Sequence, residues 1–263
     1  MQAYIFENIA NLRKYRYHLV FIRSRVETGV NMLSIFSANT ASQRFVCTTE
    51  KYNHLYSRYL VNPGNLLEMA GYETEHQLLD LCGGTGAISE AALQLGANPA
   101  NITLVDLNPR CSNQQIRQLS GHAVSKIRQL CAEGKQFDTV VCRQAFAYLE
   151  IEGESGEELA ELLAVLVNKN GRFIFNSFIR PRFHAKTYKF QGQRFIELTA
   201  YLRRRVFRLQ VNLGVVHDLT ISKWHREERI FEIFNPYFSI ETRWSKNAVY
   251  WICTRRAVKH AKN

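Results

Sequence analysis

The chain has 263 residues, of which 46% are hydrophobic and 22% charged, so it can bury a sizeable core and is not disordered overall. No apolar run approaches the roughly 18–20 residues that cross a bilayer, and none near the N-terminus resembles a secretory signal. These features predict a cytoplasmic protein without membrane association, built as one elaborated α/β domain or two small ones.

The net charge of +11 is unevenly distributed along the chain. Residues 1–171 hold 15 Lys and Arg against 17 Asp and Glu, whereas residues 172–263 hold 19 against 6. All of the net positive charge therefore lies in the last third. A basic region of this kind fits an anionic substrate, a nucleic acid or simply a solvated face.

The six cysteines are scattered, and no C-x-x-C pair occurs among them. A zinc site needs clustered ligands at short spacing, so the sequence predicts no metal site. Reduced and mostly buried thiols are the expected state.

The N-terminal region divides into two parts. Residues 1–45 show no clear period and are interpreted as an N-terminal extension of loose order. Tyrosines spaced by four and three residues within Glu50–Leu60 predict a helix with one aromatic face. After an Asn-Pro-Gly turn, a short helix is expected over Leu66–Ala70, ended by Gly71.

From residue 77 onward, short apolar runs alternate with segments of helical spacing. The expected strands are Gln77–Cys82, Ile102–Val105, Ile116–Leu119, Phe137–Val141 and Arg172–Phe175. The expected helices are Thr85–Leu95, Ser125–Cys131 and Glu157–Val167, the last followed by a turn at Asn168–Gly171. This alternation predicts an α/β fold with a Rossmann-like, mostly parallel sheet and helices on both faces.

After Phe178 the pattern changes to a β-rich insertion that follows the fifth strand. We expect strands within Arg194–Leu213 and over His217–Trp224, then a helix over Arg226–Phe234. A final antiparallel hairpin is expected from Phe238–Trp244 and Val249–Thr254. The chain is therefore divided into residues 1–45, 46–178 and 179–263.

The sharpest motif is LLDLCGGTGAIS, residues Leu78–Ser89, in which a buried strand runs through a glycine-rich turn into a helix. Glycines let a ligand approach the backbone, and the helix N-terminus offers free amide donors. Ligands bind at the carboxyl ends of strands in open α/β sheets, so this turn is a candidate ligand site.

A dinucleotide or phosphate site fits this motif poorly. The dinucleotide fingerprint G-x-G-x-x-G, started at Gly84, ends on Ser89 instead of a third glycine, and no Gly-Lys-Ser/Thr follows. Asp80 lies three residues before the first glycine, where a carboxylate suits a cationic ligand better than a pyrophosphate. A second acidic residue, Asp106, closes the next strand, where it can accept both ribose hydroxyls of an adenosine ligand.

These motifs, followed by FDTVVCRQAFAYL and LVNKNGRFIFNSF, resemble the class I S-adenosylmethionine (SAM)-dependent methyltransferases over roughly Leu66–Phe178. The C-terminal hairpin looks like the reversed last hairpin of that family. The resemblance implies a transferase with SAM as its cofactor. It assigns the SAM-binding core and an N-terminal lid helix to residues 46–178, and a substrate-side insertion with closing strands to residues 179–263.

The resemblance also implies roles for individual residues. Asp106 would hold the ribose, with Leu107 beside the adenine. His122, followed by Ala123, stands where the family usually has an aspartate that bonds the adenine amino group, and a neutral imidazole can accept that bond. The loop around the methionine part would consist of Asp80, Gly83, Thr85 and Gly86.

Further roles concern the methyl-transfer end of the site. The segment Cys142–Phe146 would form its floor, and Arg143 would orient a carboxylate of SAM or of the substrate. Tyr59, on the aromatic helix, would contact SAM as part of the lid. Enzymes that methylate exocyclic base amines carry an Asp/Asn-Pro-Pro-aromatic motif after the fourth strand, and its absence here disfavours that activity.

The acceptor is expected to be a small molecule, including anionic ones. His217 and Asp218 are candidate bases, although neighbours on a regular strand face opposite sides and would not form a dyad. The basic last third keeps an RNA or protein methyltransferase open as an alternative, and His122 keeps open a non-catalytic SAM-binding protein. The sequence does not predict the oligomeric state.

Overall fold

The computed structural model describes residues 61–149, 154–178, 184–190, 193–202, 205–212, 215–223, 225–245 and 248–256. Between residues 184 and 223 it is the backbone of the strands that is described. The predicted extension over residues 1–45 and the predicted aromatic helix over Glu50–Leu60 lie outside these ranges. None of the helices in the described ranges is long and apolar enough to cross a membrane.

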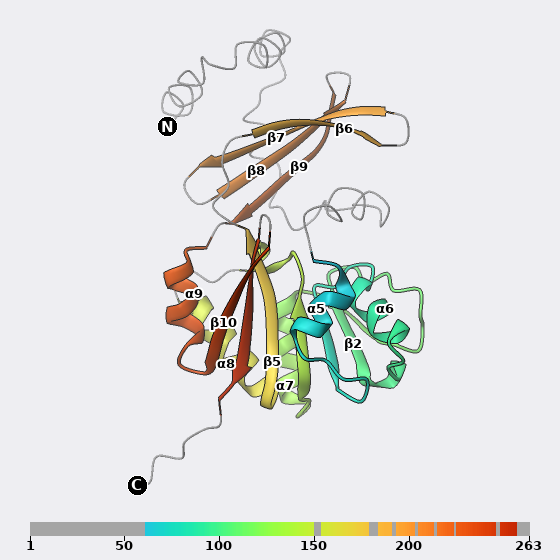
Figure 1. The fold of residues 1–263 in the computed structure, drawn as a ribbon, viewed down its shortest axis with the longest axis vertical. Coiled ribbons are helices and arrows are strands. Elements are labelled where there is room, and N and C mark those ends of the chain that lie inside the picture. The colour runs from blue at the N-terminus through green and yellow to red at the C-terminus, as the bar shows by residue number, and fades with distance from the viewer. Residues whose placement is uncertain are drawn as a thin grey trace.

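The larger of two sheets has seven strands in the order β10-β11-β5-β4-β1-β2-β3 (Figure 1). Its strands are β1 (Leu78–Leu81), β2 (Ile102–Asp106), β3 (Arg117–Ser120), β4 (Phe137–Cys142), β5 (Val167–Phe178), β10 (Phe238–Ser245) and β11 (Ala248–Arg255). Strands β1 to β5 run parallel to one another, and β11 is antiparallel to both β5 and β10. The predicted mostly parallel sheet with a reversed last hairpin is confirmed.

Helices cover both faces of this sheet because its central strands carry apolar residues on both faces. Leu78 packs with α5 (Pro63–Met69) and α6 (Ala87–Gln94) on one face, whereas Leu79 packs with the helices of the other. The helices on that second face are α7 (Ala123–Ala132), α8 (Glu154–Leu166) and α9 (Glu227–Phe234). Two short 3-10 helices, η3 (Pro99–Asn101) and η4 (Phe146–Tyr148), lie in the connections between strands and helices.

The insertion after β5 forms a second, four-stranded antiparallel sheet in the order β6-β7-β8-β9. Its strands are β6 (His184–Phe190), β7 (Gln193–Leu202), β8 (Arg205–Asn212) and β9 (Val215–Lys223). Strand β6 was not predicted, and the stretch Arg194–Leu213 forms two paired strands. Strand β9 contacts η4, which follows the carboxyl end of β4.

The predicted turn at Asn168–Gly171 is wrong, because these residues lie inside β5. The pairing of β5 with β4 shifts in register between Phe137 and Thr139, and Asn170 has a left-handed φ of 66°. A left-handed residue is compatible with an irregularity inside a strand as well as with a turn. The turn-forming composition of this segment is therefore used to bend a strand.

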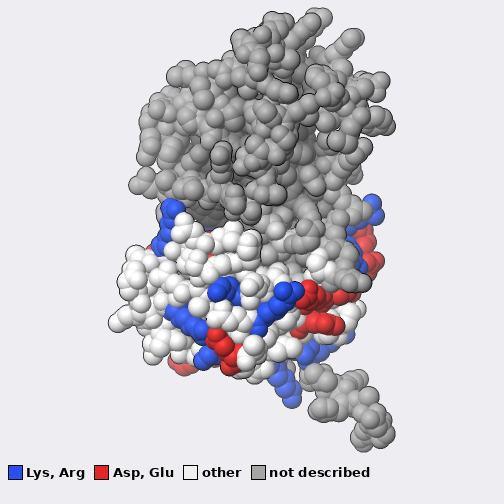
Figure 2. All heavy atoms as spheres, turned by 180° about the vertical axis from the view of Figure 1, so that it is seen from behind, with Lys and Arg blue, Asp and Glu red and all other residues white. Residues whose placement is uncertain are grey.

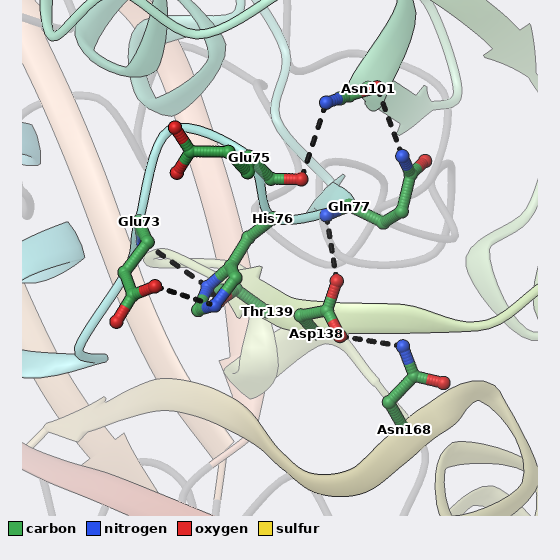
Figure 3. A network of polar contacts seen from close by, with 8 residues as sticks. All are labelled: Glu73, Glu75, His76, Gln77, Asn101, Asp138, Thr139 and Asn168. Carbon is green, nitrogen blue, oxygen red and sulfur yellow. Dashed lines mark hydrogen bonds and ion pairs between the residues drawn. The ribbon is translucent and has the colours of Figure 1, made fainter.

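Polar side chains bind the amino ends of the central strands together (Figure 3). Asp138 accepts a hydrogen bond from the backbone N–H of Gln77 at 2.9 Å and another from the side chain of Asn168 at 2.6 Å. Gln77 also donates to Asn101, at 3.0 Å, at the end of η3. This network secures the edge of the sheet opposite the carboxyl ends, where the candidate site lies.

Candidate active site

The glycine-rich turn between β1 and α6 depends on left-handed backbone conformations. Cys82, Gly84 and Gly86 have φ values of 58°, 56° and 81°. At Gly86, which caps α6, an added Cβ would lie 2.9 Å from the Cβ and Sγ of Cys111. Glycine is required there for both its conformation and its size. Thr85 lies half-buried between these two glycines.

Asp80 lies beneath the turn and is buried. Its Oδ2 accepts hydrogen bonds from the backbone N–H of Ser89 at 3.1 Å and from the Ser89 hydroxyl at 2.9 Å. Since Gly86 has no side chain, the carboxylate of Asp80 caps the first turn of α6 in its place. Its Oδ1 is buried without a hydrogen-bond partner.

Burial raises the pKa of Asp80 to about 6. The two hydrogen bonds from Ser89 and the positive charge of Arg143 lower this pKa, whereas the negative charge of Asp106 raises it further. A cation near Oδ1 would favour the ionised carboxylate for the same electrostatic reason. The charge state of Asp80 thus depends on its burial and on its charged neighbours Arg143 and Asp106.

Gly83 has to be a glycine because of this carboxylate, since an added Cβ would lie 2.4 Å from its Cγ and Oδ1. At Gly84 the nearest atom to an added Cβ is Oδ2 of Asp106, at 4.0 Å. The turn thus packs closely on Asp80 and is open above Gly84. A ligand could approach the backbone on that open side.

Asp106, at the carboxyl end of β2, connects the turn to the neighbouring loops. Its Oδ2 accepts from the backbone N–H of Gly84 at 3.0 Å, and its Oδ1 accepts from that of Asn108 at 2.9 Å. Its backbone oxygen accepts from the N–H of Gly121, 2.9 Å away, which immediately precedes His122. The structure thereby brings the glycine turn, Asp106 and the loop after β3 to one edge.

The predicted adenine-side residues lie at this edge with different exposures. Leu107 is 46% exposed, His122 is exposed at the start of α7, and Ala123 is half-buried. The His122 side chain makes no capping hydrogen bond to α7. An exposed leucine and a ring not used for capping are both accessible to a ligand at this edge.

Arg143 and Gln144 follow the end of β4. The Arg143 side chain donates to the backbone oxygen of Val61 at 3.4 Å, and its Nε is buried without a hydrogen-bond partner. The hydroxyl of Tyr250 accepts from the N–H of Val61 at 3.0 Å, so three distant segments meet here. Gln144 has a left-handed φ of 65°, and its backbone N–H donates to Oδ1 of Asn176 at 2.7 Å.

The structure does not describe the side chains of three predicted site residues, Tyr59, His217 and Asp218. Tyr59 lies outside the described residues. His217 and Asp218 lie in β9, where only the backbone is described. Asp218 pairs with Gln210 while Val216 pairs with Val211, so His217 is an extra residue at a β-bulge. The rule of opposite faces, which assumes regular pairing, does not apply across that bulge.

Sequence analysis missed several residues of this edge, namely Ser89, Asn176 and Tyr250. Ser89 was noted only as the missing third glycine, although its position in the first turn of a predicted helix could have suggested a partner for Asp80. Asn176 and Tyr250 carry no local signal, because each meets a partner that is distant in the sequence, Gln144 and Val61 respectively.

Comparison with known proteins agrees with this description. Residues 79–175 match the sequence model of a family described as "Methyltransferase domain". The matched segment begins in β1 and ends in β5, so it contains the glycine turn, Asp106 and Arg143. No curated protein matches the sequence.

Several solved structures share the fold at low sequence identity. A SAM-dependent methyltransferase from Clostridium acetobutylicum is 12% identical, with a TM-score of 0.58, and the match covers 78% of this chain and 96% of that one. The CcbJ methyltransferase from Streptomyces caelestis is 11% identical, with a TM-score of 0.59, and the match covers 79% of this chain and 97% of that one. CalS10, an amino pentose methyltransferase from Micromonospora echinaspora, is 15% identical, with a TM-score of 0.58, and the match covers 78% of this chain and 96% of that one.

The fold, the glycine turn and the family match agree on one assignment. These structures share the fold of this chain, and the carboxylates of Asp80 and Asp106 flank its glycine turn. Residues 79–175 thus form a methyltransferase domain, on a fold shared with SAM-dependent methyltransferases.

Proposed function

We propose that this protein transfers a methyl group from SAM to a small-molecule acceptor, including anionic acceptors. The observation that carries the proposal is the buried Oδ1 of Asp80, an acceptor without a partner beside a turn that Asp106 also binds. A buried carboxylate oxygen is costly unless a donor or cation complements it. The ammonium group of SAM is such a cation.

SAM supplies the methyl group already activated on a sulfonium. The residues of the chain therefore have mainly to bind, align and exclude water. Asp106 would hold the ribose hydroxyls with lone pairs left over from its bonds to Gly84 and Asn108. Arg143 would orient a carboxylate through its buried Nε, and Leu107 and His122 would contact the adenine.

Two findings support a small acceptor. Similar structures include CalS10, described as an amino pentose methyltransferase, and KedS8, described as a sugar N-methyltransferase, with a TM-score of 0.54. The contact of β9 with η4 also brings the inserted sheet next to the carboxyl end of β4. His217 and Asp218 lie in that strand, which supports their proposed role as bases for acceptors that must lose a proton.

The cofactor assignment is tested by calorimetric titration of the full chain with SAM. We expect micromolar binding for the wild type and a loss of about 30-fold or more for Asp106→Ala, because hydrogen bonds to a charged group contribute about 1.5–3 kcal/mol each. Asp138→Ala, which removes a carboxylate from the opposite edge, is the matched control and should bind normally. Absence of SAM binding by the wild type, with NAD(H) titrated alongside, would contradict the proposal.

Turnover is a separate measurement. The wild type, incubated with SAM and a panel of amino sugars and small carboxylates, should form S-adenosylhomocysteine with at least one of them. Binding of SAM without product from any acceptor would favour the non-catalytic alternative.

A further inference from the structure

Two side-chain amides at the ends of β4 and β5 are buried with their NH2 groups unpartnered. Gln144 is 7% exposed and Asn176 is 2% exposed, and neither Nε2 of Gln144 nor Nδ2 of Asn176 has a hydrogen-bond partner. Cys142 pairs with Phe175, so Asn176 lies level with the first residue after β4. Buried donors left unpaired are rare in native proteins and call for an explanation.

The contact between these residues sets the direction of one amide. The backbone N–H of Gln144 donates to Oδ1 of Asn176 at 2.7 Å, and a backbone N–H can only donate. The oxygen of Asn176 therefore faces Gln144, and its NH2 group is directed elsewhere. The same bond holds Gln144 at φ 65°, a conformation that a residue with a side chain adopts at a cost and that is often found at functional sites.

The position of the pair separates it from the cofactor residues. In the sheet order β5-β4-β1-β2, the glycine turn and Asp106 lie at the ends of β1 and β2, whereas the amides lie at the ends of β4 and β5. Strand β9 of the inserted sheet contacts η4, which begins two residues after Gln144. The pair thus lies at the carboxyl edge on the side away from the proposed adenosine site.

Resting on the function proposed above, we propose that Gln144 and Asn176 bind a carboxylate or carbonyl oxygen of the methyl acceptor. Both groups that lack partners are donors, so they complement an oxygen acceptor and not an ammonium or an apolar group. A site built to hydrogen-bond a substrate group rejects analogues that lack it, because its buried polar groups are then left unpaired. The neighbouring charge of Arg143 adds attraction for a carboxylate.

The test uses the full chain saturated with S-adenosylhomocysteine and matched sets of small ligands. Glycine, benzoate and butyrate are compared with their primary amides and with the corresponding alcohols, ethanolamine, benzyl alcohol and butanol, by saturation-transfer NMR titration. We expect at least one acid or amide to bind tenfold or more tightly than its alcohol. Stronger binding of the acid than of its amide would identify a carboxylate, and equal binding would identify a carbonyl oxygen.

Two variants test whether the side-chain amides of Gln144 and Asn176 cause the preference for acids and amides over alcohols. Gln144→Met removes Nε2 and leaves the backbone bond to Asn176 intact, and Asn176→Asp retains the acceptor for Gln144 while replacing the donor with an oxygen. Each should reduce the preference about tenfold, the loss expected for one hydrogen bond to a charged or strongly polar group. Circular dichroism and cooperative thermal unfolding show that each variant is folded.

Three results would overturn the proposal at different points. Alcohols that bind as tightly as acids and amides across all sets would exclude an oxygen-specific site. A preference that survives both folded variants would assign it to other residues. Failure of the wild type to bind S-adenosylhomocysteine, measured before any acceptor is added, would instead overturn the proposed function on which this inference rests.

Discussion

Asp80 meets two requirements with one carboxylate. Its Oδ2 caps α6 through Ser89, and its Oδ1, which has no hydrogen-bond partner, is the atom that we propose to face the ammonium group of SAM. Burial makes the ionised form costly, which raises the pKa to about 6 despite the bonds from Ser89. The same residue therefore connects the stability of the fold with the electrostatics of the site.

We predict that Asp80 makes stability fall as the pH rises from about 4 to 6. Its pKa is higher in the folded than in the unfolded chain, so its favourable contribution is fully present below about pH 4 and is lost as the pH passes about 6. A shift of this size corresponds to roughly 3 kcal/mol. Urea denaturation of the wild type and of Asp80→Asn between pH 4 and 7 measures it.

The free-energy difference between these two proteins is the quantity to follow, since other titrating groups are common to both. As the pH rises from about 4 to 6, the unfolding free energy of the wild type should fall relative to that of Asp80→Asn. A difference independent of pH would show that the pKa of Asp80 is not raised in the folded protein.

At the scale of elements, the strand–turn–helix unit β1–α6 is the part that local sequence determines most strongly. A short apolar run, three glycines in four positions and a helical period occur together, and the structure forms this unit within one or two residues of the predicted bounds. The predicted turn at Asn168–Gly171 was wrong because the local sequence did not determine the structure there. Its residues permit a turn, but they lie inside β5, between Val167, which pairs with Phe137, and Arg172, which pairs with Thr139.

The glycine turn should tolerate an added methyl group least at Gly86. Gly86→Ala combines a left-handed conformation with an approach of 2.9 Å to Cys111, and we expect a loss of about 2–4 kcal/mol of unfolding free energy. Gly134→Ala is the matched control, because φ there is 66° and nothing lies within 4 Å of the added Cβ. It should cost about 1–2 kcal/mol, from the backbone alone. If urea denaturation gives equal losses of unfolding free energy for the two variants, Cys111 moves aside for the added methyl group at no cost in free energy.

At the scale of the whole molecule, the two edges of the main sheet have different tasks. The amino ends of the strands are joined by the network around Asp138, and the carboxyl ends carry the glycine turn and Asp106. Because a strand separates them, the edges can be altered independently.

Asp138→Ala should therefore lower stability without changing SAM binding. Removal of this carboxylate leaves the N–H of Gln77 and the amide of Asn168 without their acceptor, with an expected cost of about 1–3 kcal/mol. Thermal unfolding and SAM calorimetry on the same sample test both parts. A SAM affinity reduced tenfold or more would show that the edges are coupled.

The charge of the molecule is also organised at this scale. On the face shown in Figure 2, basic and acidic side chains of the described residues are interspersed. Ion pairs on the described surface include Arg117–Glu133 and Arg229–Glu157, both at 2.7 Å, and Arg128–Glu158. Exposed pairs of this kind contribute little to stability, at most about 1 kcal/mol each.

By itself the sequence determined the α/β class, the mostly parallel sheet, the methyltransferase domain and the glycine turn with Asp80 and Asp106. These follow from signals confined to a few neighbouring residues: an apolar period, glycines where the backbone must be left-handed, and acidic residues at strand ends.

Only the tertiary structure decided which distant groups meet. Asn176 accepts from Gln144 across 32 residues, Arg143 reaches Val61 across 82, and Tyr250 reaches Val61 across 189. The bulge at His217 and the strand built from Asn168–Gly171 belong to the same category. Strand pairing brings Asn176 level with the end of β4, whereas Val61 meets Arg143 and Tyr250 because the segment before α5 packs on the core of the sheet. Neither the register of a sheet nor the packing of a distant segment on it leaves a trace in the local pattern.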